Sequence, residues 1–299
     1  MVSPGILLVD KPAGLTSHDV VARTRRAFGT RKVGHAGTLD PMATGLLVIG
    51  IEGATRLLTY IVGADKTYEA TIRLGQTTGT DDAEGEILTT AEPGAWSAVT
   101  DAAIDRGILA LTGEISQVPS SVSAIKVDGR RAYDRVRAGE EVVLAARDVV
   151  VSRFDVSARR RQDGSLDLDV IVDCSSGTYI RSLARDLGAS LGVGGHLTAL
   201  RRTRVGPFEV GDAVGLDDLE GARTLTPGDA AGRILPVLDV SADEARDLRH
   251  GKRLHGQAGR LDGAGAVAAA IDADGVLVGI VEKRGTDVKS AMNMPEGDR

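Results

Sequence analysis

Residues 34–45 read Gly-His-Ala-Gly-Thr-Leu-Asp-Pro-Met-Ala-Thr-Gly. The glycines and the proline predict an irregular backbone path, and Asp40 stands directly before Pro41, which favours an extended backbone at Asp40. The apolar run Leu46–Ile51 follows and predicts a buried strand. A carboxylate held on a rigid loop beside a buried strand suits a nucleophile or a base. An Asp-Pro pair on its own is more often an ordinary turn.

The segments around this loop show strand and helix patterns. Ile6–Val9 is apolar and predicts a strand, and Ser17 is placed to cap a helix from about His18 to Phe28. Alternation in Thr67–Leu74 puts Tyr68 on the apolar face of a strand. Further along we expect a helix at Asp101–Leu111, strands at Val149–Ser157 and Leu166–Val172, and a helix at Thr178–Leu187 capped by Ser176 or Thr178 and ended by Gly188.

Two segments differ in composition and pattern from the rest of the chain. Gly75–Glu86 is Gly-rich and acidic but lacks the spacing of a calcium loop, so we expect a mobile surface loop. After about Pro236, Ser241–Arg249 predicts a helix, and two strands flank the hairpin signal Asp272-Ala273-Asp274-Gly275. This tail is long enough for a small β-rich module, and its polar end from Lys283 onward is expected to fray.

Composition sets limits on function. The 299 residues carry a net charge of −6, with 42% apolar and 26% charged residues, as in an ordinary soluble protein. No apolar run approaches a membrane span, no signal peptide is visible, and the single Cys174 permits no internal disulfide, so we expect a cytoplasmic protein. The five histidines show no metal-ligand spacing.

Basic residues are clustered although the total charge is acidic. The clusters are Arg23, Arg25, Arg26, Arg31 and Lys32; then Arg130, Arg131, Arg135 and Arg137; then Arg201, Arg202 and Arg204. Binding to phosphates requires a local basic face rather than a basic total. Charge alone favours three solvated surfaces over an RNA-binding surface.

Four further side chains are candidates for chemistry or binding. His35 suits an acid, a base or a stacking platform, or is merely a surface residue. Tyr68 and Tyr179 are either packed in the core or form an aromatic wall for a stacked base. Arg181 follows Tyr179 by two residues and is able to pair with a buried carboxylate or a phosphate.

The order of these motifs resembles the TruB family of tRNA pseudouridine synthases over essentially the whole chain. The similar blocks are residues 10–17 (DKPAGLTS), 34–45, 66–70 (KTYEA), 74–78 (LGQTT), 123–133 (SAIKVDGRRAY), 177–188 (GTYIRSLARDLG), 200–203 (LRRT) and 206–208 (GPF). One difference is visible, because residues 118–122 read Val-Pro-Ser-Ser-Val where the family usually has Pro-Pro and an aromatic residue.

The resemblance implies an α+β fold with a mixed, mostly antiparallel sheet flanked by helices. It implies a catalytic domain at residues 1–235 and a PUA-like RNA-binding domain at residues 236–299, with a frayed tail. The implied activity converts uridine 55 of the tRNA T loop to pseudouridine, by base flipping, cleavage of the glycosidic bond and formation of a C–C bond. No cofactor and no metal are expected.

The resemblance also implies roles for individual residues. Asp40 is the catalytic carboxylate, either as a nucleophile at C1′ or as a base leading to a glycal, and Arg181 is expected to pair with it. Tyr68 stacks on the uracil and is placed to move the C5 proton. His35, Tyr179, Leu200, Lys11, Lys126 and Arg202 are the expected substrate-binding residues. The expected partner is the T arm of tRNA, bound by a monomer without an obligate protein partner and without a membrane.

Other readings remain open at this point. One is a uridine isomerase acting on another RNA, including relatives that use guide RNAs. Another is a non-catalytic RNA-binding protein or a tRNA folding chaperone, which would not need Asp40. A glycoside hydrolase normally needs a pair of carboxylates, and no motif supplies a partner for Asp40.

Overall fold

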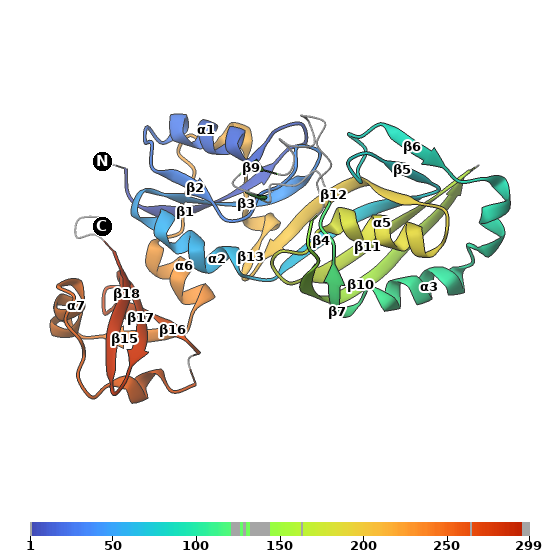
Figure 1. Cartoon of the computed structure of the whole chain (residues 1–299). Helices are drawn as coiled ribbons and strands as arrows, with labels where there is room; N and C mark the ends of the chain where they lie inside the picture. Colours follow the sequence, from blue (N-terminus) through green and yellow to red (C-terminus); the bar gives the residue numbers. More distant parts are fainter. Residues whose placement is uncertain are drawn as a thin grey trace. The chain divides into compact units, whose positions relative to one another are not determined.

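The computed structural model describes residues 2–120, 126–127, 130–131, 144–162, 164–263 and 265–294 (Figure 1). Contacts divide the chain into two compact units. Unit 1 holds residues 1–41, 45–63 and 205–299, and unit 2 holds residues 42–44 and 64–204. Each unit is described by itself.

The sheet of unit 1 is mixed and contains the predicted N-terminal strands. β1 (Gly5–Lys11) pairs antiparallel with β3 (Thr44–Ile51) and parallel with β14 (Val214–Gly215), and β2 (Val33–His35) pairs antiparallel with β3. One core cluster contains Leu7, Val9, Leu47, Ile49 and Ile51 from these strands together with Val20 and Val21 from α1 (Ser17–Ala27). The predicted loop at Gly34–Gly45 is shorter than expected, because β2 and β3 extend into it.

Helix α1 begins at Ser17, one residue before the predicted start, and its cap is one residue earlier as well. Thr16 accepts a hydrogen bond from the Asp19 backbone N–H at 3.1 Å, and the Asp19 carboxylate accepts from the Thr16 N–H at 2.8 Å, forming a capping box. The prediction of Ser17 as the cap was wrong, because its hydroxyl is already bonded to the backbone of Leu39.

The rest of unit 1 consists of short elements and a C-terminal module. The short elements are the 3₁₀ turns η1 (Glu52–Leu57), η3 (Val210–Asp212) and η4 (Leu216–Asp218), the helices α2 (Leu58–Val62) and α6 (Pro227–Ile234), and strand β13 (Phe208–Glu209). The module holds β15 (Val237–Val240), α7 (Ala242–Arg249), η5 (Ala258–Leu261), β16 (Val267–Asp272), β17 (Leu277–Arg284) and β18 (Asp287–Asn293).

The C-terminal module has its own four-stranded sheet and its own core. β15 and β16 are parallel, and β16–β17 and β17–β18 are antiparallel. The predicted hairpin turn is present: the Asp272 carboxylate accepts from the N–H groups of Asp274 and Val276, and Gly275 has φ +76°. The prediction of fraying from Lys283 onward was wrong for the described residues, because they complete β17 and form β18, whose Val288 is fully buried.

The sheet of unit 2 has the strand order β12-β4-β11-β10-β7, and its β4–β11, β11–β10 and β10–β7 pairs are antiparallel. Its strands are β4 (Lys66–Leu74), β7 (Gly113–Gln117), β10 (Arg147–Gln162), β11 (Ser165–Cys174) and β12 (Gly195–Val205). Short pairs are β5 (Gln76–Thr78) with β6 (Ile87–Thr90), and β8 (Lys126–Val127) with β9 (Arg130–Arg131). As predicted, Tyr68, Ala70, Ile72 and Leu74 are buried along β4; Lys66 and Thr67 at the start of the strand are buried as well.

Helices of unit 2 cover this sheet. α5 (Ile180–Ser190) packs on β4 and on α3 (Asp101–Ala110), which follows the 3₁₀ turn η2 (Pro93–Ala98) (Figure 1). The predicted caps of α5 were wrong, since Tyr179 is the N-cap residue and no side chain of its own caps the helix. Gly188 does not end α5: a Cβ there would lie 2.2 Å from the Gly194–Gly195 backbone, so glycine permits close packing.

The acidic segment Gly75–Glu86 is not a surface loop along its whole length. It starts with β5, and Asp82 is only 3% exposed. Asp81 has φ +61°, in the left-handed region that aspartate tolerates better than most residues. This turn directs the two neighbouring carboxylates toward arginines of α5, as described below.

Candidate active site

The loop that carries Asp40 is fixed to its own unit by backbone hydrogen bonds. The Leu39 N–H donates to the Ser17 hydroxyl at 2.9 Å, and the Gly14 N–H donates to the Pro41 carbonyl at 2.8 Å. Gly37 and Gly45 adopt φ +96° and +98°, which side chains rarely permit. The half-buried Asp40 therefore stands on a constrained backbone between α1 and β3, as a reacting carboxylate requires.

Lys11 lies under this loop and is fully buried. Its ammonium donates to the carbonyls of Pro12 at 2.9 Å, Leu15 at 2.7 Å and Pro41 at 3.3 Å. Three carbonyls match the three donors of an ammonium group, so Lys11 ties the turn after β1 to the residue that follows Asp40. These bonds hold the loop and do not test whether Lys11 contacts substrate, so that contact stays a prediction.

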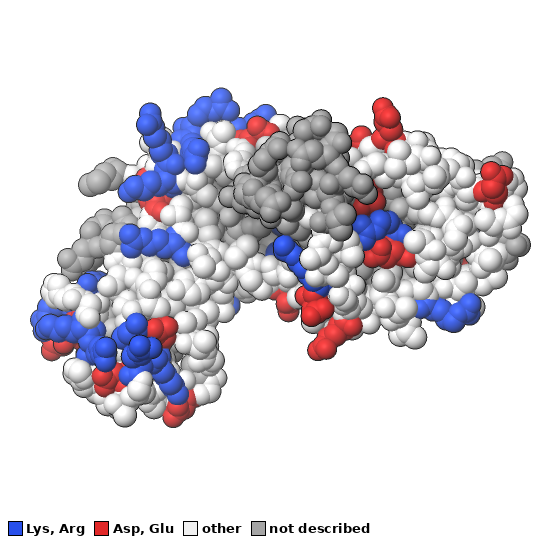
Figure 2. All heavy atoms as spheres, viewed as in Figure 1, with Lys and Arg blue, Asp and Glu red and all other residues white. Residues whose placement is uncertain are grey.

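His35 ends β2 and lies edge-to-face against His18 of α1, with ring centroids 5.6 Å apart and an interplanar angle of 81°. Around the same helix, Lys and Arg side chains gather on the surface (Figure 2). Arg25, Arg26, Arg31 and Lys32 are all exposed there, and Lys32 pairs with Glu52 at 3.3 Å.

Unit 2 supplies the remaining predicted residues whose side chains are described. Tyr68 on β4 and Leu200 on β12 are each 8% exposed, and Arg202 is 1% exposed, so this arginine is not part of a solvated surface. The backbone of Lys126 forms β8, but its side chain lies outside the described residues, as do the side chains of Arg130, Arg131, Arg135 and Arg137.

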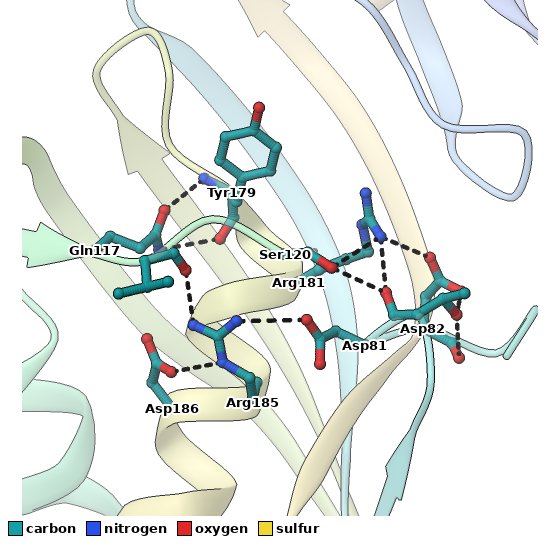
Figure 3. Close-up of polar contacts among 10 residues, drawn as sticks. Asp81, Asp82, Gln117, Ser120, Tyr179, Arg181, Arg185 and Asp186 are labelled. Carbon is teal, nitrogen blue, oxygen red and sulfur yellow. Dashed lines mark hydrogen bonds and ion pairs between the residues drawn. The ribbon is translucent and has the colours of Figure 1, made fainter. Parts of the chain in front are cut away.

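Arg181 is held by a polar network that the sequence reasoning missed (Figure 3). Its Nη1 lies 3.5 Å from an Asp82 carboxylate oxygen and donates to the Thr80 carbonyl at 2.7 Å and to the Ser120 hydroxyl at 3.3 Å. Both charged side chains of this ion pair are 4% exposed. Because a buried guanidinium needs nearby negative groups, Asp82 fixes both the position and the charge balance of Arg181.

A second, more exposed pair lies one helical turn further along α5. Arg185 Nη1 lies 3.5 Å from Asp81, its Nε donates to Asp186 at 2.9 Å, and its Nη2 donates to the Val118 carbonyl at 2.7 Å (Figure 3). Adjacent aspartates thus face arginines spaced four residues apart. The sequence held a signal for this network: two adjacent aspartates, and two arginines at positions i and i+4, which share one face of a helix.

Two titratable groups of unit 2 have pKa values far from their ordinary values. Burial, and to a smaller extent the positive charge of Arg202, lower the pKa of the Lys66 ammonium to about 8. Burial also raises the pKa of the Cys174 thiol to about 11, which keeps the thiol protonated and unreactive at neutral pH. Lys66 donates to the Ala64 carbonyl at 2.6 Å.

A groove of about 590 Å³ crosses β4, β11 and β12 in unit 2. Its lining includes Thr44, Glu69, Asp169, Leu200 and Arg201, so among the predicted site residues whose side chains are described, only Leu200 borders it. Among the described residues, no group of three histidine, cysteine, aspartate or glutamate side chains is placed to hold a metal ion. No helix in the described ranges has the length and apolar character needed to cross a membrane.

Comparison with known families identifies the chain. The model for the N-terminal domain of TruB family pseudouridylate synthases matches residues 25–180. The chain belongs to this family. A model described as a tRNA pseudouridylate synthase B C-terminal domain matches residues 181–238, and one described as the C-terminal part of tRNA pseudouridine synthase II matches residues 235–295. The predicted TruB resemblance is confirmed.

Relatives in this family match almost the full chain. A protein from Leifsonia xyli subsp. xyli named tRNA pseudouridine synthase B is 62% identical, covering 99% of this chain and 98% of the relative. One of the same name from Corynebacterium aurimucosum is 58% identical, covering 94% and 93%.

Solved structures support the fold. One titled "Structure of H/ACA RNP bound to a substrate RNA containing 2'-deoxyuridine" has a TM-score of 0.71 at 24% identity, covering 98% of this chain and 86% of that one. The predicted α+β fold with a mixed sheet and helices is confirmed. The boundary between residues 235 and 236 stays a prediction.

Proposed function

We propose that this protein is a tRNA pseudouridine synthase that isomerises uridine 55 in the T loop. The observation that carries the proposal is the match to relatives named tRNA pseudouridine synthase B, at 62% and 58% identity over nearly the full chain. The constrained loop around Asp40 supports it, because the reaction needs a carboxylate in a fixed place.

The reaction breaks one bond and forms another on the same nucleotide. The N1–C1′ bond breaks, the uracil turns, C5 bonds to C1′, and a proton leaves C5 while N1 gains one. Asp40 acts either as a nucleophile at C1′ or as a base that leads to a glycal intermediate. Atoms and electrons balance without an oxidant or a second substrate, so we expect turnover without a cofactor or a metal.

The other residues prepare and complete this step. Arg181 pairs with Asp40 in the reaction and orients its carboxylate, and Asp82 in turn fixes Arg181. Tyr68 stacks on the uracil and its hydroxyl moves the C5 proton. Tyr179 and Leu200 form the pocket wall, and Lys11 supports the Asp40 loop from below.

Binding must extract a base from a folded tRNA loop, which costs a few kcal/mol. His35 fills the space that the base leaves, and Lys126 contacts the RNA. The predicted RNA contact of Arg202 requires its buried side chain to become exposed on binding. The basic surface around α1 (Arg23, Arg25, Arg26, Arg31 and Lys32) holds phosphates of the T arm, which makes binding dependent on salt. Residues 236–299 act as a PUA-like RNA-binding domain of a cytoplasmic monomer that needs no obligate protein partner.

Release of tritium from an unmodified tRNA transcript labelled at uridine C5 tests this function. Purified protein is incubated with the transcript and EDTA, without any other protein or RNA, beside Asp40→Asn. Release by the wild type alone supports a cofactor-free and guide-free isomerase that depends on Asp40. Absence of release from both proteins, with tRNA binding intact, refutes the proposal and favours another RNA target or a purely RNA-binding role.

A further inference from the structure

The main chain at the start of helix α5 is held by a side chain of another element. The helix has no side-chain cap of its own. Tyr179 is its N-cap residue, with φ −106° and ψ 109°. The Gln117 side chain bonds both polar groups of the Tyr179 backbone: its Oε1 accepts from the Tyr179 N–H at 2.8 Å, and its Nε2 donates to the Tyr179 carbonyl at 3.1 Å (Figure 3). The start of α5 is therefore fixed from outside the helix.

Gln117 is well placed to hold this residue firmly. It is the last residue of β7, where it pairs with Arg147 of β10, and it is 2% exposed. A primary amide presents one acceptor and two donors in a plane, so it matches a peptide N–H and C=O as a neighbouring strand would. Since no water reaches a buried amide freely, moving Tyr179 would leave costly unpaired groups on both partners.

The residues that follow Gln117 also contact α5, but through other groups. The Val118 carbonyl accepts from Arg185, and the fully buried Ser120 hydroxyl accepts from Arg181. The contacts of Val118 and Ser120 hold arginine side chains. The contact of Gln117 holds the main chain from which the Tyr179 ring projects.

We infer that Gln117 is a positioning residue for the reaction, acting through the backbone of Tyr179 to set the ring in the pocket wall. This inference rests on the proposed function. A rotation of the Tyr179 backbone by roughly 10–20° is at the limit of what a productive site tolerates. A misplacement of about 1 Å can lower a rate by ~100-fold. The side chain of Gln117 touches no reacting atom and acts only through this geometry.

A double-mutant cycle tests whether Gln117 acts through the tyrosine ring. Gln117→Ala, Tyr179→Ala and the double variant are compared by tritium release under single-turnover conditions with excess enzyme, so that slow rates remain measurable. We expect Gln117→Ala to lower the rate about 10- to 100-fold, with the protein concentration for half-saturation changed less than about threefold. In the Tyr179→Ala background the same change should cost less than about twofold, because the ring it positions is already gone.

Val118→Ala is the matched control, since Val118 lies next in the chain and is 45% exposed. Its carbonyl still accepts from Arg185, so its rate should equal that of the wild type. Losses that multiply in the double variant, or a normal rate for Gln117→Ala, would overturn the inference. No release by the wild type would instead refute the proposed function, which is a distinct outcome.

Gln117→Glu keeps the test valid if the alanine variant fails to fold. Its carboxylate still accepts from the Tyr179 N–H, but it opposes the Tyr179 carbonyl with a second oxygen instead of a donor. Protonation restores the donor, so its rate relative to the wild type should rise as pH falls from 8 to 5.5, while the ratio for Val118→Ala stays flat. A flat ratio for Gln117→Glu would count against a role for the amide donor.

Discussion

Replacing Asp82 by asparagine should destabilise the protein strongly, although the substitution only exchanges one carboxylate oxygen for an amide NH2 group. The side chains of Asp82 and Arg181 are both 4% exposed, with 3.5 Å between the charged atoms. Asparagine keeps an oxygen for the Glu84 N–H, which the carboxylate accepts at 3.0 Å, so the substitution mainly removes charge. Breaking a buried ion pair costs about 3–5 kcal/mol, and Arg181 keeps the Thr80 carbonyl, so we expect roughly 3 kcal/mol.

Urea denaturation and single-turnover kinetics measure the two consequences. At a slope of about 3 kcal/mol/M, a loss of about 3 kcal/mol moves the midpoint down by about 1 M. The rate should fall about 10- to 100-fold, since Arg181 is then less firmly oriented toward the reacting carboxylate.

Asp81→Asn is the matched control for this prediction. Its partner Arg185 lies at the same distance of 3.5 Å, but the two side chains are 17% and 28% exposed. We expect a loss of about 0.5–1 kcal/mol, as for exposed pairs. If the two asparagine variants differ by less than about 1 kcal/mol, burial does not determine the strength of these pairs and the reasoning fails.

Three further changes test other parts of the structure. Lys11→Met should lose about 3 kcal/mol in urea denaturation, because three carbonyls lose a charged donor; an unchanged midpoint would exclude its structural role. Lys66 binds its proton less tightly in the folded protein, with a pKa of about 8, so stability should rise by roughly 3 kcal/mol as pH increases from 8 to 10.5. Lys66→Met should lack that increase when urea denaturation midpoints are compared across pH. An equal increase in both proteins would contradict the lowered pKa of Lys66 as its cause. The hydrogen bond from Arg73 lowers the pKa of Asp167, so the pair stabilises the protein above about pH 4 and this stability is lost as pH falls further. The difference in stability between wild type and Arg73→Leu should therefore shrink between pH 4 and 2, and a constant difference would show that the pair is not its cause.

Local patterns were sufficient to predict most elements. The alternation around Tyr68 predicted β4, and the apolar run Leu46–Ile51 predicted β3, because burial of one or both faces of a strand leaves a direct trace in sequence. The hairpin at Asp272–Gly275 followed from side-chain bonds to a nearby backbone. The family itself followed from the order of its motifs.

Helix ends were predicted less well, because competing partners decide them. Ser17 and Thr16 are both good caps, and the choice fell to Thr16 since Leu39 occupies the Ser17 hydroxyl. Gly188 resembles a helix end, but its missing side chain serves close packing against Gly194 and Gly195. These outcomes depend on residues 6 to 22 positions away, which no local pattern contains.

The sequence by itself determined the family, the candidate carboxylate Asp40 and most strands and helices, because these depend on residue types and on spacing along the chain. Only the tertiary structure decided that Asp82 is a buried partner of Arg181 rather than part of a surface loop, and that Gln117 holds Tyr179. The physical reason is that a charge or an amide takes its role from the groups it meets after folding, and those groups lie about 60 to 100 residues away in the chain.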